Sequence, residues 1–128
     1  MQFTLPIYYK QEFKTKPAKT HLLGMNWYNG AHYQLKNKVK ARYHSLVADQ
    51  AWSFKHVNQF KVHYTVFFKN PQTDISNVVA VLEKFFLDGL KSANLITDDS
   101  NKFHLGSSWS IGGQDKANPR IEITLQEV

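Results

Sequence analysis

The segment from Ser76 to Lys91 constrains the fold of this chain more than any other. Its apolar side chains recur at intervals of three and four residues, and its polar side chains fall between them. This spacing predicts a helix that buries one face in the core. The apolar stripe consists of Val78, Val81, Leu82, Phe85, Phe86 and Leu90, and the opposite side carries Asn77, Lys84, Asp88 and Lys91.

A second helix and four strands are predicted around this helix. His32–Asp49 also has helical spacing, with basic residues on much of its surface. The polar stretch Lys10–Lys19, the glycine-flanked Gly24–Gly30 and the pair Gly112-Gly113 predict loops or breaks. The order of elements predicts one α/β (α+β) domain over residues 1–128, with a single small mixed β-sheet and two main helices. The strands, which alternate apolar and polar residues, are Gln2–Ile7, Gln59–Phe68, Lys102–Ile111 and Arg120–Leu125.

Length and composition exclude several classes of protein. A chain of 128 residues fits one domain, and 42% hydrophobic residues is too apolar for a disordered chain. The absence of cysteine excludes disulfides, thiolate metal ligands and cysteine nucleophiles. No apolar run is long enough to span a membrane, and the first residues lack the pattern of a signal peptide. We therefore expect a cytoplasmic protein with no membrane partner.

The charge is distributed unevenly along the chain. The net charge is +6, yet residues 1–64 hold ten basic residues and only two acids, whereas residues 65–128 hold six basic residues and eight acids. A basic half suits a polyanion such as nucleic acid. Carboxylates gathered in the other half suit a divalent cation.

Three acids flank the predicted helix at residues 76–91. Asp74 lies between a strand and this helix, and Asp98 and Asp99 follow the helix after one short connection. We expect the strand–turn–helix–turn path to bring both acidic points to one end of the sheet. Two or three carboxylates suffice for Mg²⁺, which can polarise a phosphodiester and ready a water as nucleophile. Lys84 would then offset charge on the phosphate.

Each of these residues also has a purely structural explanation. Aspartate is favoured at helix N-caps, so Asp74 could serve only as a cap. Adjacent aspartates are common in loops, so Asp98 and Asp99 could form a solvated turn. Lys84 and Asp88 are one turn apart and could form an ordinary surface ion pair.

Three stretches in the second half of the chain together match the pattern of a known protein family. They are Asp74-Ile75-Ser76-Asn77, then Lys84-Phe85-Phe86-Leu87-Asp88-Gly89-Leu90, then Leu95-Ile96-Thr97-Asp98-Asp99. They resemble the RusA family of Holliday junction resolvases, whose signature is an Asp-x-Asp-Asn that opens a helix, a lysine inside it, an Asp-Ala-Leu at its end and a closing Asp-Asp. The flanks resemble the family more weakly, in Met25-Asn26-Trp27-Tyr28 with His32-Tyr33 upstream and in Asn118–Ile123 downstream.

The resemblance implies a compact α/β homodimer that cuts four-way DNA junctions with Mg²⁺ or Mn²⁺. By motif position, Asp74 and Asp99 would hold the metal, Asp98 would complete the closing pair, and Lys84 is the helix lysine. Asp88 is a further candidate metal ligand. The candidate DNA-binding residues are Lys14 and Lys16 in the polar arm, Lys36, Lys38, Lys40 and Arg42 in the basic helix, and Asn26 and Tyr28. Tyr28, with Trp27 and Tyr33, could stack on bases, although Tyr33 could equally pack in the core.

The sequence departs from the family pattern at two places. Ser76 stands where the family has its second acid, and about four residues more, roughly one helical turn, separate Asn77 from Asp88. A whole turn keeps Lys84 on the same face of the helix. The missing carboxylate suggests an alternative, which is a catalytically weakened protein of the same fold that binds DNA or a host protein.

Overall fold

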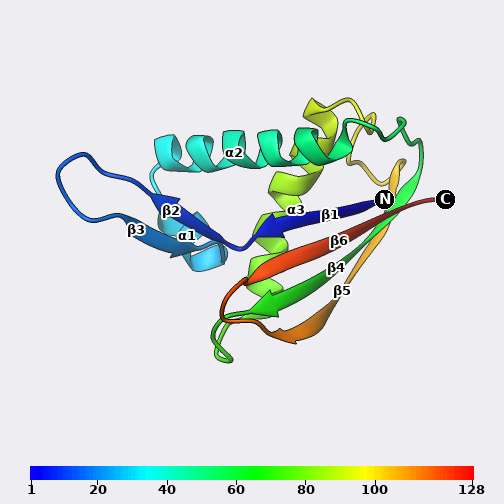
Figure 1. Ribbon diagram of the computed structural model, residues 1–128. Coiled ribbons are helices and arrows are strands. Elements are labelled where there is room, and N and C mark those ends of the chain that lie inside the picture. The colour runs from blue at the N-terminus through cyan, green and yellow to red at the C-terminus, as the bar shows by residue number, and fades with distance from the viewer.

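A four-stranded sheet in the order β1-β6-β4-β5 is the framework of the computed structural model, which describes residues 1–128 (Figure 1). β6 pairs antiparallel with both β1 and β4, whereas β5 pairs parallel with β4, so the sheet is mixed as predicted. The strands are β1 (Gln2–Pro6), β4 (Phe60–Phe68), β5 (His104–Gln114) and β6 (Arg120–Glu127).

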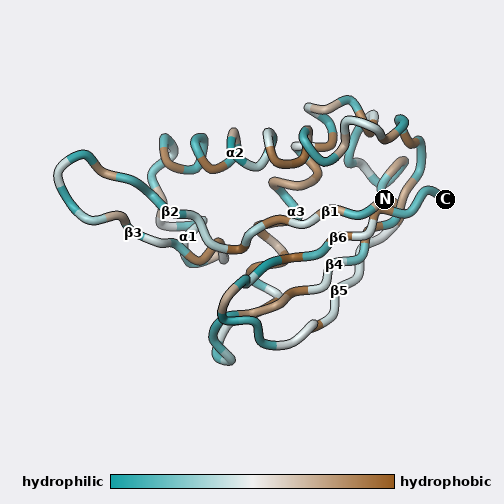
Figure 2. The backbone as a smooth tube through the Cα atoms, viewed as in Figure 1, coloured by the Kyte–Doolittle hydropathy of each residue, from teal (hydrophilic) through white to brown (hydrophobic).

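Two long helices, α2 (Tyr33–Ala51) and α3 (Ile75–Ser92), cover one face of this sheet (Figure 1). Both match predicted helices to within about two residues at each end. α3 buries most of its apolar stripe, and in Figure 2 the hydrophobic side of α2 faces the sheet. The fully buried Phe86 lies edge-on to Phe3 of β1, with ring centroids 5.0 Å apart. Burial of such a side chain contributes about 1.5–3 kcal/mol.

β4 shows why the sheet has one buried face and one open face. Its residues alternate strictly, with Val62, Tyr64 and Val66 buried toward the helices. Lys61 and His63 point to the other side, which no helix covers. Such one-sided burial is typical of sheets with antiparallel strands.

Two segments that were predicted as loops contain regular structure. Gly24–Gly30 contains a short helix, α1 (Met25–Gly30), and the polar arm is the connection of a hairpin formed by β2 (Tyr8–Gln11) and β3 (Lys19–Leu22). The hairpin projects from the body of the domain (Figure 1). α1 packs through Trp27 and Tyr28 against Phe85 of α3, with ring centroids 6.3 Å apart in both pairs. This tertiary contact outweighs the turn-forming glycines and asparagines of the segment.

The prediction that Gly112-Gly113 ends the fifth element was wrong, because β5 continues through both glycines to Gln114. A β-bulge lies at this point, where the pairing with β4 shifts register between Val66 and Phe67. The Phe67 ring lies so close that a Cβ on Gly112 would be 2.7 Å from it, and Gly113 has φ +128°. Glycine is therefore required here to carry the strand across the bulge.

None of the three helices is long and apolar enough to cross a bilayer.

Candidate functional site

Asp74 caps the N-terminus of α3. Its carboxylate accepts the backbone N–H of Asn77 at 3.4 Å, the Ser76 hydroxyl at 2.9 Å and the Asn77 side-chain amide at 3.0 Å. The structural explanation of Asp74 as an N-cap is thus confirmed. The residue is also exposed, and it lines a cavity of about 310 Å³ together with Asn26 and Trp27 of α1. The carboxylate is therefore oriented and accessible at once.

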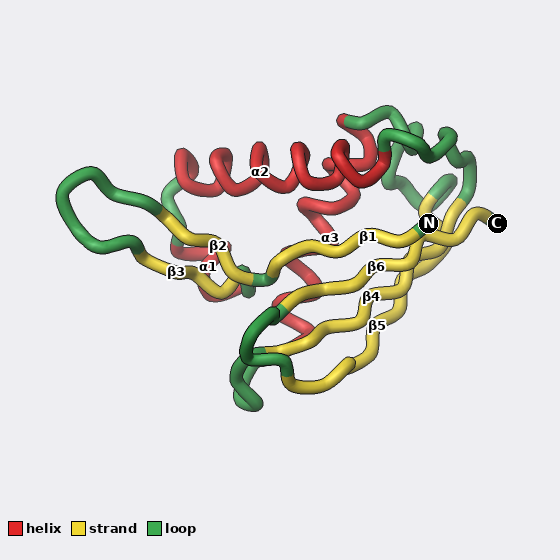
Figure 3. The backbone as a smooth tube through the Cα atoms, viewed as in Figure 1, coloured by secondary structure: helices red, strands yellow, loops and turns green.

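Asp98 and Asp99 do not meet Asp74 within one chain, and the prediction that both acidic points share one end of the sheet was wrong. Asp74 precedes the first residue of α3, whereas the pair follows its last residue. The 18 residues of α3 span about 27 Å at 1.5 Å per residue. Figure 3 shows the loops before and after α3 at opposite ends of the sheet. A strand–turn–helix–turn path returns the chain to the end where the strand began, so it separates the two points.

Asp88, Asp98 and Asp99 are brought together around Lys91. The Lys91 amine lies 3.6 Å from Asp88, 3.9 Å from Asp98 and 3.5 Å from Asp99. Partial burial lowers the pKa of Lys91, but the carboxylates of Asp99 and Asp88 outweigh it and raise that pKa above its usual value. The backbone N–H of Asp99 lowers the pKa of Asp98. All three carboxylates are therefore partly neutralised by one ammonium group.

The expected surface pair between Lys84 and Asp88 is not formed. Asp88 instead pairs across to Lys40 of α2 at 3.4 Å, and to Lys91. Lys84 remains exposed, with its amine 5.8 Å from the centroid of the Tyr28 ring. Its charge is thus free to act on an external anion.

A basic groove lies between α1, α2 and α3, beside Lys84. The Lys36 amine sits 4.6 Å from the centroid of the same Tyr28 ring, and Tyr33 is 64% exposed, so it does not pack in the core. The groove has a volume of about 220 Å³ and is lined by Tyr28, Tyr33, Lys36, Asn37, Lys40, Lys84, Phe85 and Asp88. Ammonium groups beside exposed aromatic faces can hold phosphates and stack bases.

The four basic residues predicted on α2 divide between two sides of the helix. Lys36 and Lys40 face the basic groove. Lys38 and Arg42 are two residues further along, which turns them about 200° away, toward solvent. Lys14 and Lys16 lie in the β2–β3 connection, where the Lys16 amine is 4.3 Å from the Phe13 ring centroid. Only half of the basic helix therefore contributes to the groove.

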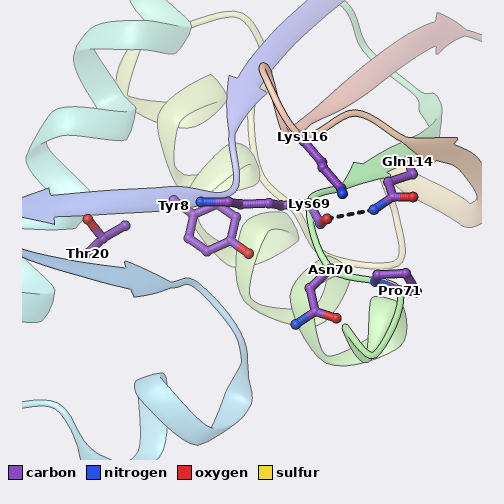
Figure 4. A pocket seen from close by; sticks show the side chains of 7 residues that line it. All are labelled: Tyr8, Thr20, Lys69, Asn70, Pro71, Gln114 and Lys116. Carbon is purple, nitrogen blue, oxygen red and sulfur yellow. Dashed lines mark hydrogen bonds between the residues drawn. The ribbon is translucent and has the colours of Figure 1, made fainter.

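The largest cavity, of about 890 Å³, lies where β4 and β5 end beside the β2–β3 hairpin (Figure 4). It contains Lys69 and Lys116, neither of which has a carboxylate partner, and the Gln114 amide donates to the Lys69 carbonyl at 3.1 Å. Its floor reaches Asn70 and Pro71, shortly before Asp74 in the chain. Neither lysine was predicted from the sequence as a site residue, because only the pairing of β4 with β5 places the two together.

No three histidine, aspartate or glutamate side chains of one chain are grouped so that they could hold a metal ion. What the chain does present is a polar stripe on α3, made of Asn77, Lys84, Asp88 and Lys91, with Asp74 at one end and the Asp98–Asp99 pair at the other. The basic groove lies beside the middle of this stripe.

No protein-family model matches the sequence, and no curated protein matches it either.

Proposed function

We propose that this protein is a metal-dependent endonuclease that cuts branched DNA, as its resemblance to RusA resolvases implies. The observation that carries the proposal is the polar stripe of α3, which has carboxylates at both of its ends and a lysine-lined groove beside its middle. Lysines would neutralise phosphates, and carboxylates would hold the cation that the chemistry needs. Neither part alone distinguishes a nuclease from a simple DNA-binding protein.

The basic groove supplies the binding part of the proposal. Lys84 and Lys36 lack carboxylate partners, so DNA phosphates would not need to displace an existing ion pair there. The unpaired lysines of the largest cavity, Lys69 and Lys116, add a second positively charged surface. Binding should therefore weaken steeply with salt, and each lysine replaced by glutamine should reduce the salt slope by about one.

Two carboxylates and the phosphates of the substrate are enough for Mg²⁺. Asp74 fits such a role because Ser76 and Asn77 orient its exposed carboxylate. Asp99 fits it if the Lys91 side chain adopts another rotamer and leaves the Asp99 carboxylate free. A divalent cation bound there would polarise the scissile phosphodiester and ready a water for attack. Lys84 would hold the phosphate in the groove beside it.

A homodimer would unite the two acidic points. Since Asp74 and the Asp98–Asp99 pair lie at opposite ends of α3, one chain cannot offer both to one phosphate. In a two-fold dimer with antiparallel α3 helices, Asp74 of one protomer would approach the closing pair of its partner. Two such sites related by two-fold symmetry suit the symmetric strands of a four-way junction.

A subunit-mixing experiment tests the proposal. Asp74→Asn and Asp99→Asn should each reduce nicking of a labelled four-way junction in Mg²⁺ or Mn²⁺ by about 100-fold or more. If the site is shared, an equimolar mixture of the two variants should recover nicking. In the mixed dimer, one site carries both substitutions and the other carries neither, so cuts should appear in one strand only.

Each outcome of the mixing experiment has one meaning. Inactive variants whose mixture is also inactive would place each metal site within one chain. Full activity in both single variants would refute the assigned carboxylates. Junction binding without nicks by the wild type, in either metal, would favour the alternative of a DNA-binding module. That alternative is motivated by Ser76, which replaces a family acid, and by Lys91, which already neutralises the closing pair.

A further inference from the structure

The two edge strands of the sheet differ in how their free backbone groups are satisfied. On β1, the side-chain amide of Gln50 in α2 forms the hydrogen bonds that a neighbouring strand would otherwise form. The Thr4 N–H donates to Gln50 Oε1 at 2.7 Å, and Gln50 Nε2 donates to the Thr4 carbonyl at 2.8 Å. Pro6 has no N–H, and its carbonyl accepts the Tyr43 hydroxyl. The β1 edge is therefore closed to another strand.

The β5 edge is open. β5 has 11 residues and is hydrogen-bonded to β4 alone, and it lies at the outer margin of the sheet in Figure 1. It contains no lysine, arginine, aspartate, glutamate or proline, although such residues normally protect an exposed edge. Trp109 and Ile111 are 45% and 59% exposed. An uncharged edge of this length with exposed apolar side chains is a template for pairing.

The exposed apolar residues of β5 lie on one side of the strand. Ser107 donates to Glu83 of α3 at 2.7 Å, so this residue points to the helix-covered side of the sheet. Strand alternation places Trp109 and Ile111 on the same side. Ser108 and Ser110 point to the open side, where both contact the His63 ring, at 2.7 and 3.0 Å. The segment from Gly106 to Ile111 pairs with β4 without a register shift.

We propose that β5 pairs antiparallel with β5 of a second copy of this chain, to form one continuous eight-stranded sheet. Residues opposite one another in an antiparallel pair share a face, so Trp109 and Ile111 of the two copies would meet beside α3. The strand carries no lysine, arginine, aspartate or glutamate, so self-pairing opposes no such charges along it. Gln50 blocks the β1 edge, so the assembly ends at two chains and cannot grow into a filament.

This dimer would also be compatible with a metal site shared between the two protomers. Only in this respect does the inference rest on the proposed function. α3 begins where β4 ends, and it leads back toward the start of β5. Reversing β5 in the partner brings Asp74 of one protomer and the closing pair of the other to the same end of the joined sheet. The interface itself is inferred from the sheet edges alone.

The mass in solution tests the interface without DNA or metal. Light scattering at micromolar concentration should give twice the 14.9 kDa of one chain for the wild type. Ile111→Lys should give one chain, because it places a charged side chain among the apolar residues that would be buried between the two copies. Trp52→Lys, which changes an exposed apolar residue away from β5, should remain a dimer. Circular dichroism should show that both variants are folded.

Disulfide cross-linking tests the register, since the natural chain has no cysteine. At least one of Ser108→Cys, Trp109→Cys and Ser110→Cys should form a linked dimer on mild oxidation, because opposite residues of antiparallel strands lie within disulfide range. Trp52→Cys should not. A wild-type mass of one chain would overturn the proposal, and so would a dimer that survives Ile111→Lys and forms no cross-link. A dimer that behaves as expected but cuts no DNA would refute the proposed activity alone.

Discussion

The two ends of α3 carry aspartates in opposite electrostatic settings. At the N-terminal end, Asp74 accepts hydrogen bonds from uncharged donors and has no cationic partner. At the C-terminal end, Asp88, Asp98 and Asp99 surround the Lys91 amine within 3.9 Å. The first carboxylate is held in place but keeps its charge available, whereas the others are already partly neutralised. Aspartates at the two ends of α3 therefore differ in how much negative charge is available to bind a metal ion.

The largest expected effect is on stability at the N-terminal end. Asp74→Ala should lower the free energy of unfolding by about 1 kcal/mol, because the α3 N-terminus loses its cap. Asp74→Ser keeps a capping oxygen and should lose much less. Asp98→Ala, at a half-exposed position in the connection between α3 and β5, should change the free energy by less than about 0.5 kcal/mol. Urea unfolding measures all three, and equal losses in the two alanine variants would contradict the comparison.

The next effect concerns the cation at the C-terminal end. Lys91→Met should destabilise the fold by about 0.5 kcal/mol, because three carboxylates would then repel one another in a largely solvated site. Millimolar Mg²⁺ should raise the Tm of this variant more than that of the wild type, since the cation replaces the lost ammonium. Lys84→Met removes a lysine of the same helix that pairs with no carboxylate, and it should show no such extra response.

A smaller effect is expected from restoring the family acid at the N-terminal end. Ser76→Asp should lower stability by a few tenths of a kcal/mol without metal, since a donor to Asp74 is lost and a like charge added, against a favourable helix dipole. Mn²⁺ should reverse this loss and bind more tightly than to the wild type. Ser76→Ala, which lacks both the donor and the charge, should not respond. Water-proton relaxation with Mn²⁺ measures the difference.

The smallest effect is a dependence on acidic pH at the C-terminal end. The pKa of Asp98 lies below its usual 3.8, chiefly because of the Asp99 backbone N–H. A lowered folded-state pKa means that the stabilisation is present above about pH 4 and is lost as the pH falls through the folded pKa. Below pH 4, the wild type should therefore lose stability more steeply than Asp98→Asn. Parallel curves in acid unfolding would contradict a lowered pKa of Asp98 in the folded state.

The site was only partly predictable from sequence. Lys84 and Asp88 were assigned correctly to α3, because helical spacing fixes which residues share a face, and Asp74 was placed correctly just before this helix. The distance between Asp74 and Asp99 was misjudged, because it depends on the direction in which the chain re-enters the sheet. Which side of α2 forms the basic groove depends on the packing of α1 through Trp27 and Tyr28, which the glycine-flanked local sequence does not reveal.

The sequence by itself determined the elements that bury apolar side chains at regular intervals, namely α2, α3, β1, β4 and β6. In those segments, local periodicity and tertiary burial favour the same structure. Only the tertiary structure decided the features that depend on contacts between distant segments. Gln50 closes the β1 edge, Phe67 requires Gly112 in a continuing β5, and Lys91 collects three carboxylates from two parts of the chain. Such contacts join residues that no local pattern relates, so their energies appear only once the chain is folded.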